Sequence, residues 1–349
     1  MLGAKSYILV DADSGQVLAE HNADERLPPA SLTKVMTTYV VFHELANGHL
    51  TLETPVTVSE KAWRTPGSRS FIDLHAKIPV QDLLKGVIVQ SGNDASVALA
   101  EHVAGDESTF AELMNQHAKR LGLENSHFKN SDGLPHPEHY TTARDLARLT
   151  RALIQSFPEY YKWHALKEFT LNGITQQNRN RLLWLDESVD GVKTGHTEEA
   201  GYCLVASALR ENMRLISVVM GTDSVRARSR DTQALLNYGF RFFETHPIAK
   251  AGEPLLQTKV WKGDIPELPL GMKSDLFVTV ARNRFKEVQT STEVTQKIIA
   301  PVEDGEPLGT LRVTLGDQTL VDQPLVALRP VAKGSLFSRL VDEARLLFK

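Results

Sequence analysis

Residues 28–40 read PPASLTKVMTTYV, and Ser31 and Lys34 within this stretch decide how the rest of the chain is interpreted. Two prolines precede an apolar run, which predicts that a helix begins here. A serine at a helix start often caps the helix, and a lysine three residues later could simply lie in solvent. The same spacing places a hydroxyl and an amine on one helical face, as a nucleophile and its base would require. Other parts of the sequence must distinguish these two interpretations.

The bulk composition is that of an ordinary globular protein. The chain has 349 residues, of which 42% are hydrophobic and 23% charged, and its net charge is −4. This length predicts two domains, and without a basic patch interleaved with aromatics we expect no nucleic-acid partner. The single cysteine, Cys203, lies in an apolar run and is expected to be a small buried residue. No apolar stretch approaches the roughly 18–20 residues that span a bilayer.

Residues 1–245 alternate between strand and helix patterns that predict an α+β domain. Residues 6–10 and 16–20 should form a hairpin, and 201–209 and 213–222 are again strand-like. Helices are expected at 82–105 with a break at 91–93, at 108–123, at 141–157 with Thr141 or Thr142 as the cap, and at 231–246. We therefore predict an antiparallel sheet that pairs strands from both ends of the domain and carries a helical cluster on its faces.

Residues 246–332 change in composition and predict a small all-β domain. Short strand-like segments such as 276–280 and 287–294 are separated by Gly- and Pro-rich turns. Residues 311–315 and 319–321 flank Gly316-Asp317 and should form a hairpin. This part of the sequence offers no candidate catalytic groups.

Residues 333–349 predict an amphipathic C-terminal helix. Leu336, Leu340 and Leu347 fall on one helical face, and Phe337, Val341 and Phe348 lie beside them. The opposite side carries Arg339, Asp342, Glu343, Arg345 and Lys349. Two interpretations stay open for this helix, which could pack on its own domain or lie in a membrane interface.

Two further short motifs carry side chains suited to acyl transfer. Ser91-Gly92-Asn93 interrupts two apolar helical segments, where Ser91 could relay a proton and Asn93 could hold a substrate amide. Lys193-Thr194-Gly195 precedes a strand, so it could place a cation and a hydroxyl along a sheet edge that pairs with an extended peptide. Taken alone, the first motif is a plausible helix cap and the second an ordinary turn.

A nucleophilic Ser31 would need a base, because a serine hydroxyl is unreactive at neutral pH. The histidines are scattered, and there is no Gly-x-Ser-x-Gly turn. Lys34 can serve if its pKa falls. Burial disfavours the charged form of an amine, and the positive end of a helix dipole does the same.

The combination of Ser-x-x-Lys, Ser-x-Asn and Lys-Thr-Gly, in this order, resembles the penicillin-recognising serine enzymes. The stretches LPPASLTK, SGNDAS and KTGHTEEAGYCLVASA look like those of the low-molecular-mass D-alanyl-D-alanine carboxypeptidases of the penicillin-binding protein 5 and 6 type. The resemblance covers nearly the whole chain. It implies a β-lactamase/transpeptidase-like domain at 1–245, the all-β domain at 246–332 and an amphipathic helix at 333–349.

Carried over by motif, the resemblance makes Ser31 the acylated nucleophile, Lys34 its base and Ser91 the residue that passes a proton to the departing D-alanine. Backbone N–H groups of Ser31 and His196 would form the oxyanion hole. The remaining substrate-binding residues implied are Asn93, Lys193, Thr194, Gly195, His196 and Arg228. Arg226 and Arg230 are alternatives to Arg228 for recognition of the substrate carboxylate.

The resemblance implies removal of the terminal D-alanine from peptidoglycan stem peptides, and trapping of the same serine by β-lactams. It further implies a periplasmic enzyme on the inner membrane, attached through the C-terminal helix, which we expect to be a truncated form of the family's membrane anchor. Because the family is made with a signal peptide and none is seen here, we expect this sequence to correspond to the processed chain. No cofactor or metal is expected, because there is no His-Glu-x-x-His and no cysteine pair.

Two rival interpretations compete with this one. A class A β-lactamase uses an additional Glu for deacylation, and Glu138 in SDGLPHPEHYTT is the candidate, although no Glu-x-x-Leu-Asn arrangement surrounds it. We therefore expect penicillin adducts that are stable or released slowly. The second rival is a non-catalytic cell-wall binding module, against which the intact Ser31, Lys34, Ser91 and Lys193 argue.

Overall fold

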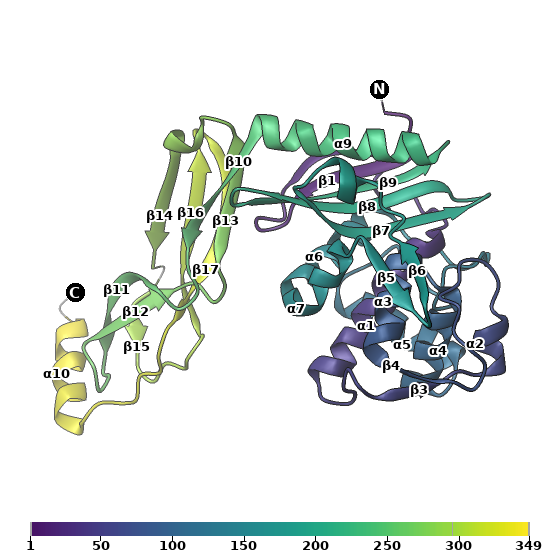
Figure 1. The fold of residues 1–349 in the computed structure, drawn as a ribbon. Coiled ribbons are helices and arrows are strands. Elements are labelled where there is room, and N and C mark those ends of the chain that lie inside the picture. The colour runs from purple at the N-terminus through teal and green to yellow at the C-terminus, as the bar shows by residue number, and fades with distance from the viewer. Residues whose placement is uncertain (1, 295, 348–349) are drawn as a thin grey trace. The chain divides into compact units, whose positions relative to one another are not determined.

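The structure, a computed structural model, describes residues 2–294 and 296–347 (Figure 1). It divides into two compact units, Met1–Phe240 and Arg241–Lys349, called here the N-terminal and C-terminal units. The N-terminal unit mixes helices with an antiparallel sheet, and the C-terminal unit is built mainly from strands. The predicted fold class, an α+β region followed by an all-β region and a terminal helix, is confirmed.

A five-stranded antiparallel sheet organises the N-terminal unit, with strand order β2-β1-β9-β8-β7. Its strands are β1 (Ser6–Asp11), β2 (Val17–His21), β7 (Val189–Thr197), β8 (Gly201–Arg210) and β9 (Met213–Thr222). The first strand pairs with β9, so that Leu9 stands opposite Ser217, and the predicted pairing of strands from both ends of this region is confirmed. The strand that carries Lys193-Thr194-Gly195, β7, lies at the edge of the sheet.

Helices cover both faces of this sheet, as Figure 1 shows. Because successive side chains of a strand point to opposite faces, Ile8 and Val10 of β1 join the core formed with the helical cluster. Leu9 and Leu215 instead face α9 (Val225–Phe242), where Gly239 allows close approach of the helix to the sheet. Cys203 of β8 is fully buried, as predicted.

The helical cluster follows the predicted segments, with differences at their ends. It contains α1 (Lys34–Ala46), α2 (Glu60–Arg64), α3 (Val80–Lys85), the π-helix η2 (Gly86–Gln90), α4 (Asn93–Ala104), α5 (Glu107–Arg120), α6 (Ala143–Ser156), α7 (Pro158–Tyr161) and α8 (Leu182–Leu185). Short 3₁₀ turns occur at η1 (Ala30–Thr33) and η3 (Lys162–Ala165), and small hairpins pair β3 (Pro55–Thr57) with β4 (Lys77–Pro79) and β5 (Glu168–Leu171) with β6 (Ile174–Gln177). Thr142 is the cap of α6, where its hydroxyl accepts the N–H of Asp145.

The prediction for 231–246 was wrong at both ends. The helix begins at Val225 and ends at Phe242, and residues 243–246 belong to the strand β10 (Phe243–Ala249). The segment FETH gave no clear helix-stop signal, and its extended conformation is fixed by pairing with a distant strand, β13, in which Thr245 stands opposite Thr279. Non-local pairing of this kind overrides local propensity.

The C-terminal unit contains a six-stranded sheet of order β14-β16-β17-β12-β11-β15 and the pair β10–β13. The bounds are β11 (Pro254–Trp261), β12 (Glu267–Gly271), β13 (Leu276–Ala281), η4 (Phe285–Glu287), β14 (Val288–Glu293), β15 (Ile298–Ile299), β16 (Pro307–Leu315) and β17 (Gln318–Ala327). The hairpin predicted around Gly316-Asp317 is present as β16–β17. Leu268, Val313 and Leu325 lie at the centre of its core and are fully buried.

The described part of the chain ends with α10 (Leu336–Leu347). On this helix Asp342 accepts the backbone N–H of Lys262, and Glu343 forms an ion pair with the Lys262 side chain. Leu336, Phe337 and Leu340 remain 75%, 79% and 69% exposed. The side chain of Leu347 and the whole of Phe348 and Lys349, also assigned to this helix from the sequence, lie outside the described residues.

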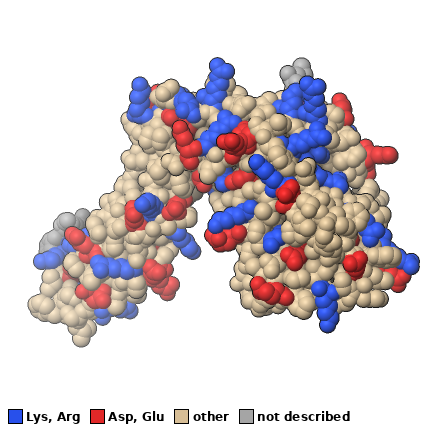
Figure 2. Space-filling view, viewed as in Figure 1, with Lys and Arg blue, Asp and Glu red and all other residues tan. Residues whose placement is uncertain are grey.

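Charged side chains of both signs are scattered over the face of the molecule in Figure 2. This distribution agrees with the small net charge of −4. Among the residues that the structure describes, no helix is both long enough and apolar enough to cross a bilayer.

Candidate active site

The amine of Lys34 lies against the hydroxyl of Ser31, at the junction of η1 and α1. Lys34 Nζ is 3.0 Å from Ser31 Oγ, because the tight turn of Ala30–Thr33 brings both side chains to one side. Lys34 Nζ also donates to Asn93 Oδ1 at 2.7 Å and to the carbonyl of Asp132 at 2.6 Å. Ala30, immediately before the serine, has a left-handed backbone (φ 48°), a strained conformation of the kind found at functional sites.

The geometry around Lys34 is suited to a neutral amine that accepts a proton. A neutral amine keeps two N–H groups and one lone pair. The two carbonyl oxygens of Asn93 and Asp132 can accept both N–H groups, which leaves the lone pair directed at the Ser31 hydroxyl. Lys34 is fully buried, and this burial lowers its pKa to about 8, against the opposing influence of Asp132.

A second serine–lysine pair lies across the cleft. Ser91 follows the π-helix η2 in a left-handed conformation (φ 67°), and its hydroxyl accepts from Lys193 Nζ at 2.8 Å. Lys193 also donates to the carbonyl of Thr194 at 2.9 Å. Burial and the neighbouring charge of Lys34 lower the pKa of Lys193 well below its ordinary value.

Gly92 lies between Ser91 and Asn93, in close contact with a neighbouring loop. A Cβ atom at this position would come within 2.0 Å of Ser70 Oγ, so an aspartate here, as in the Ser-Asp-Asn form of the motif, would force Ser70 to shift. Asp94 holds the same loop by accepting the backbone N–H groups of Ser70 and Phe71 at 2.8 and 3.0 Å. One wall of the cleft is thereby held by Gly92 of the motif and by Asp94, the residue that follows it.

The edge strand β7 forms the other wall. Gly195 lies close to η1, since a Cβ atom there would stand 3.0 Å from the carbonyl oxygen of Pro29. His196 is exposed and stacks on Tyr202 with ring centroids 3.9 Å apart. Arg228 of α9 reaches beneath the strand and donates to the carbonyl of Gly195 at 3.1 Å. The edge strand β7 lines the cavity at residues 194–196, and this end of the strand can receive an extended peptide.

These residues line one cavity of about 440 Å³. It is bordered by Ser31, Gly67, Ser68, Ser91, Arg179, Thr194, Gly195, His196, Tyr202, Val225 and Arg228. The structure thus brings Ser31, Ser91, Thr194, Gly195, His196 and Arg228 to one cleft, with Lys34, Asn93 and Lys193 hydrogen-bonded at its floor. Within the described residues, no carboxylate lines it, and Glu138 pairs with Lys129 on the surface instead.

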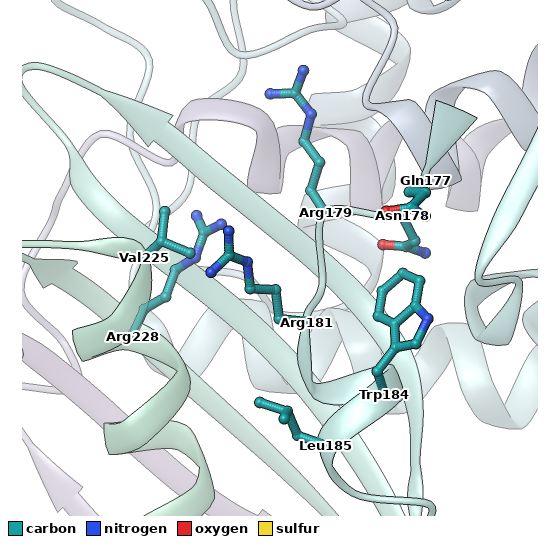
Figure 3. A pocket seen from close by; sticks show the side chains of 8 residues that line it. All are labelled: Gln177, Asn178, Arg179, Arg181, Trp184, Leu185, Val225 and Arg228. Carbon is teal, nitrogen blue, oxygen red and sulfur yellow. The ribbon is translucent and has the colours of Figure 1, made fainter. Parts of the chain in front are cut away.

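A second cavity of about 690 Å³ shares Arg179, Val225 and Arg228 with the first (Figure 3). Arg181, Trp184 and Leu185 complete much of its lining. Burial is the largest cause of the lowered pKa of Arg228, and the positive charges of Arg179 and Arg181 lower this pKa further. The three guanidinium groups together therefore give this cavity a positive electrostatic field. No carboxylate partner lines this cavity in the described part of the chain, and the field is suited to anions.

Sequence reasoning missed several of these contributors. Arg179 and Arg181 lie in a polar segment between a small hairpin and α8 and carry no motif. The carbonyl of Asp132 has no side-chain signature at all, although Asp132 stands in the polar run SDG that indicates a turn close to the site. Asn93, assigned to the substrate amide, is occupied in the structure, since its Nδ2 donates to the carbonyl of Pro66 at 2.7 Å.

An α+β fold with a buried lysine against a serine in an open cleft defines the class of serine acyl-transfer enzymes that use lysine where others use histidine. Comparison with known families agrees. Residues 1–224 match the family model of D-alanyl-D-alanine carboxypeptidase, peptidase S11, and residues 243–333 match the penicillin-binding protein 5 C-terminal domain. The chain therefore belongs to the S11 family of D-alanyl-D-alanine carboxypeptidases.

Individual relatives are similar over almost their whole length. The chain is 45% identical to D-alanyl-D-alanine carboxypeptidase DacC of Escherichia coli K12 over 353 residues, which covers 99% of this chain and 88% of DacC. Penicillin-binding protein 5 from Haemophilus influenzae matches with a TM-score of 0.90 and 41% identity, over 95% of this chain and 98% of that one. Ampicillin-bound penicillin-binding protein D2 from Listeria monocytogenes matches 69% of this chain and 98% of its own, with a TM-score of 0.64 and 31% identity.

Proposed function

We propose that Ser31 is the acylated nucleophile of a serine D-alanyl-D-alanine carboxypeptidase that β-lactams inhibit. The activity and the β-lactam binding are those of the family to which the chain belongs. The observation that carries the assignment is the buried Lys34 amine 3.0 Å from the Ser31 hydroxyl, with two carbonyl oxygens for its N–H groups. Family membership makes a non-catalytic binding module the weaker interpretation.

In acylation, neutral Lys34 takes the proton of the Ser31 hydroxyl while Oγ attacks the carbonyl carbon of the penultimate D-alanine. The backbone N–H groups of Ser31 and His196 stabilise the resulting oxyanion, each worth roughly 3–4 kcal/mol. Collapse of the intermediate breaks the C–N bond and leaves an ester on Ser31. A proton reaches the departing amine of D-alanine through Ser91, whose hydroxyl accepts from Lys193.

Deacylation requires water and a base. Lys34 is the residue positioned to act as the base in this step as well, because no carboxylate of the described residues lines the cleft to activate the water. A penicillin adduct keeps its ring-derived leaving group covalently attached, and without a dedicated carboxylate it should be released slowly. Rapid hydrolysis of penicillin would contradict this part of the proposal.

The substrate is expected to lie along β7 with its C-terminal carboxylate toward Thr194 and Arg228. Asn93 acts mainly on Lys34, and Lys193 acts on Ser91. The guanidinium groups of Arg179, Arg181 and Arg228 attract acidic peptides to this end of the cleft. Peptidoglycan stem peptides that end in D-Ala-D-Ala carry such carboxylates.

The direct test is release of D-alanine from a synthetic peptide that ends in D-Ala-D-Ala, together with the intact mass after exposure to penicillin. Wild type should release D-alanine and gain one penicilloyl group, and Ser31→Ala should do neither. A Ser31→Ala protein that retains either property would remove Ser31 from this role.

We further propose that the protein works in the periplasm at the surface of the inner membrane. In this proposal residues 1–245 perform the chemistry, residues 246–332 form the all-β domain and residues 333–349 contact lipid. The support is that α10 uses Asp342 and Glu343 toward Lys262 and leaves Leu336, Phe337 and Leu340 exposed. Sedimentation with anionic vesicles should carry wild type down and leave Leu340→Asp in solution, whereas equal sedimentation of both would contradict it.

A further inference from the structure

A cluster of metal-binding side chains lies where two helices of the N-terminal unit end. His43 and Glu44 belong to the last turn of α1 (Lys34–Ala46), and His117 belongs to the last turn of α5 (Glu107–Arg120). Each offers one ligand atom, and these three atoms lie within 4.8 Å of one another. Two imidazoles and one carboxylate form a donor set that zinc uses in proteins.

The distances are close to those of a metal site. His43 Nδ1 is 3.5 Å from Glu44 Oε1, and the rings of His43 and His117 stand 4.6 Å apart at 70°. A tetrahedral ion with bonds of about 2.0–2.1 Å separates its ligand atoms by roughly 3.3 Å. The His43–Glu44 pair therefore needs almost no movement, and the His117 ring a small one.

His117 supplies an independent indication. Its ring is only 2% exposed, and its Nε2 atom has no hydrogen-bond partner. A buried nitrogen without a partner is costly in a folded protein and calls for an explanation. A metal ion would accept its lone pair in place of the missing donor.

The Nδ1 atom of His43 also lies beside this cluster. The Asn47 amide donates to His43 Nδ1 at 3.0 Å, so this nitrogen acts as an acceptor while it faces a carboxylate oxygen of Glu44. Two acceptors this close are stabilised by a cation between them, which would replace the Asn47 amide on Nδ1.

The surroundings favour a cation on balance. The C-terminal ends of α1 and α5 both carry partial negative charge. His49 Nδ1 lies 2.6 Å from Glu44 Oε2 and forms a hydrogen bond with this carboxylate oxygen. Metal ligands in proteins commonly have such an outer hydrogen-bond partner. The charge of Arg120 acts on His117 and opposes the ion.

We infer that His43, Glu44 and His117 bind one divalent transition-metal ion of the zinc type, with water completing the coordination. Along α1, His43 lies nine residues from Lys34, roughly 13 Å at 1.5 Å per residue. The ion would thus join α1 to α5 and take no part in acyl transfer. Sequence reasoning had no means of finding this site, because residues 43–44 and 117 are far apart in the chain and form no motif.

The test is a titration of the untagged, chelator-treated protein with Zn²⁺, followed by isothermal calorimetry and by metal analysis after dialysis. Wild type should bind one ion per chain, and Glu44→Gln and His43→Ala should each weaken binding by about 10-fold or more. His49→Ala should weaken it by about 10-fold as an outer-shell change. Because His117 is buried and its replacement could disturb folding, the decisive variants are those of the half-buried His43 and Glu44.

His102→Ala is the matched control, because His102 is an exposed histidine in the last turn of α4. It should bind Zn²⁺ as wild type does. Zn²⁺ should also raise the melting temperature of wild type and of this control but not of Glu44→Gln, and it should leave the rate of penicillin acylation unchanged. Absence of a stoichiometric site in wild type, or equal binding by Glu44→Gln and wild type, would overturn the inference.

Discussion

The cleft contains two serine–lysine pairs that look alike in distance and differ in surroundings. Lys34 Nζ is 3.0 Å from Ser31 Oγ, and Lys193 Nζ is 2.8 Å from Ser91 Oγ. Both lysines are buried, and burial is the largest influence on the pKa of each. A hydrogen-bonded serine and lysine are therefore not sufficient to define a nucleophile.

The neighbouring charges distinguish the two pairs. Asp132, Asp94 and Glu107 oppose the effect of burial at Lys34, Arg179 adds to it, and the pKa of Lys34 is lowered to about 8. Lys193 instead faces Lys34, Arg179 and Arg228, all of which lower its pKa further. Identical functional groups can thus take separate roles through their environment. Lys34 can give and take a proton near neutral pH, whereas Lys193 is suited to holding Ser91, because its Nζ donates to Ser91 Oγ and to the carbonyl of Thr194.

Lys34→Ala should give the largest effect. Loss of the base should lower the rate of penicillin acylation by about 10³–10⁴-fold, near the upper end of general-base contributions. Stopped-flow acylation measures the rate, and circular dichroism checks the fold. Lys119→Ala, a change of an exposed lysine on α5, is the control and should acylate normally. Normal acylation by Lys34→Ala would remove Lys34 from the role of base.

Ser91→Ala should be slower by a smaller factor, about 10², at the low end of proton-transfer contributions. The expected reason is that the leaving group loses its proton relay while Ser31 and Lys34 remain paired. Mass spectrometry should still find one penicilloyl group per chain after long exposure. Complete loss of acylation would make the two pairs equally essential and would contradict the comparison.

Acylation should depend on pH through the neutral form of Lys34. Because burial lowers the pKa of this amine to about 8, the neutral fraction rises as the pH rises toward and past that value. The rate should increase about 50-fold between pH 6 and pH 8 and then level off. A rate that is constant over this range, measured with the same penicillin, would show that deprotonation of Lys34 does not control acylation.

Arg181→Ala should give the smallest effect. It removes one of three guanidinium groups beside the cleft, so KM for an acidic peptide should rise about threefold with kcat unchanged. Added salt should reduce the difference between variant and wild type. Arg64→Ala, which changes an exposed arginine paired with Glu60, is the control and should leave KM unaltered.

Those parts of the site whose chemistry depends on side chains within a short motif could be predicted from the sequence. Ser31, Lys34, Ser91 and Lys193, which the structure brings to one cleft, could be singled out from spacing and resemblance, and the strands β1, β8 and β9 from their apolar patterns. These elements are specified locally, and their hydrophobic periodicity agrees with the sheet that they form.

What could not be predicted depends on contacts between distant segments. The Asp132 carbonyl that binds Lys34 is a backbone group, 98 residues away along the chain. Arg179 and Arg181 resemble surface arginines until the fold brings them to Arg228. The strand at residues 243–246 likewise exists because β13 pairs with it. No periodicity in the local sequence carries this information.

Peptide mapping of the penicillin-treated protein compares the two pairs in a single measurement. After proteolysis, the penicilloyl mass should be found on the peptide that contains Ser31, and the peptide that contains Ser91 should be unmodified. Both peptides come from one sample, so differences in folding or exposure time cannot favour either serine. A penicilloyl group on Ser91, or on both serines in similar amounts, would contradict the assignment of Ser31 and Lys34 as nucleophile and base.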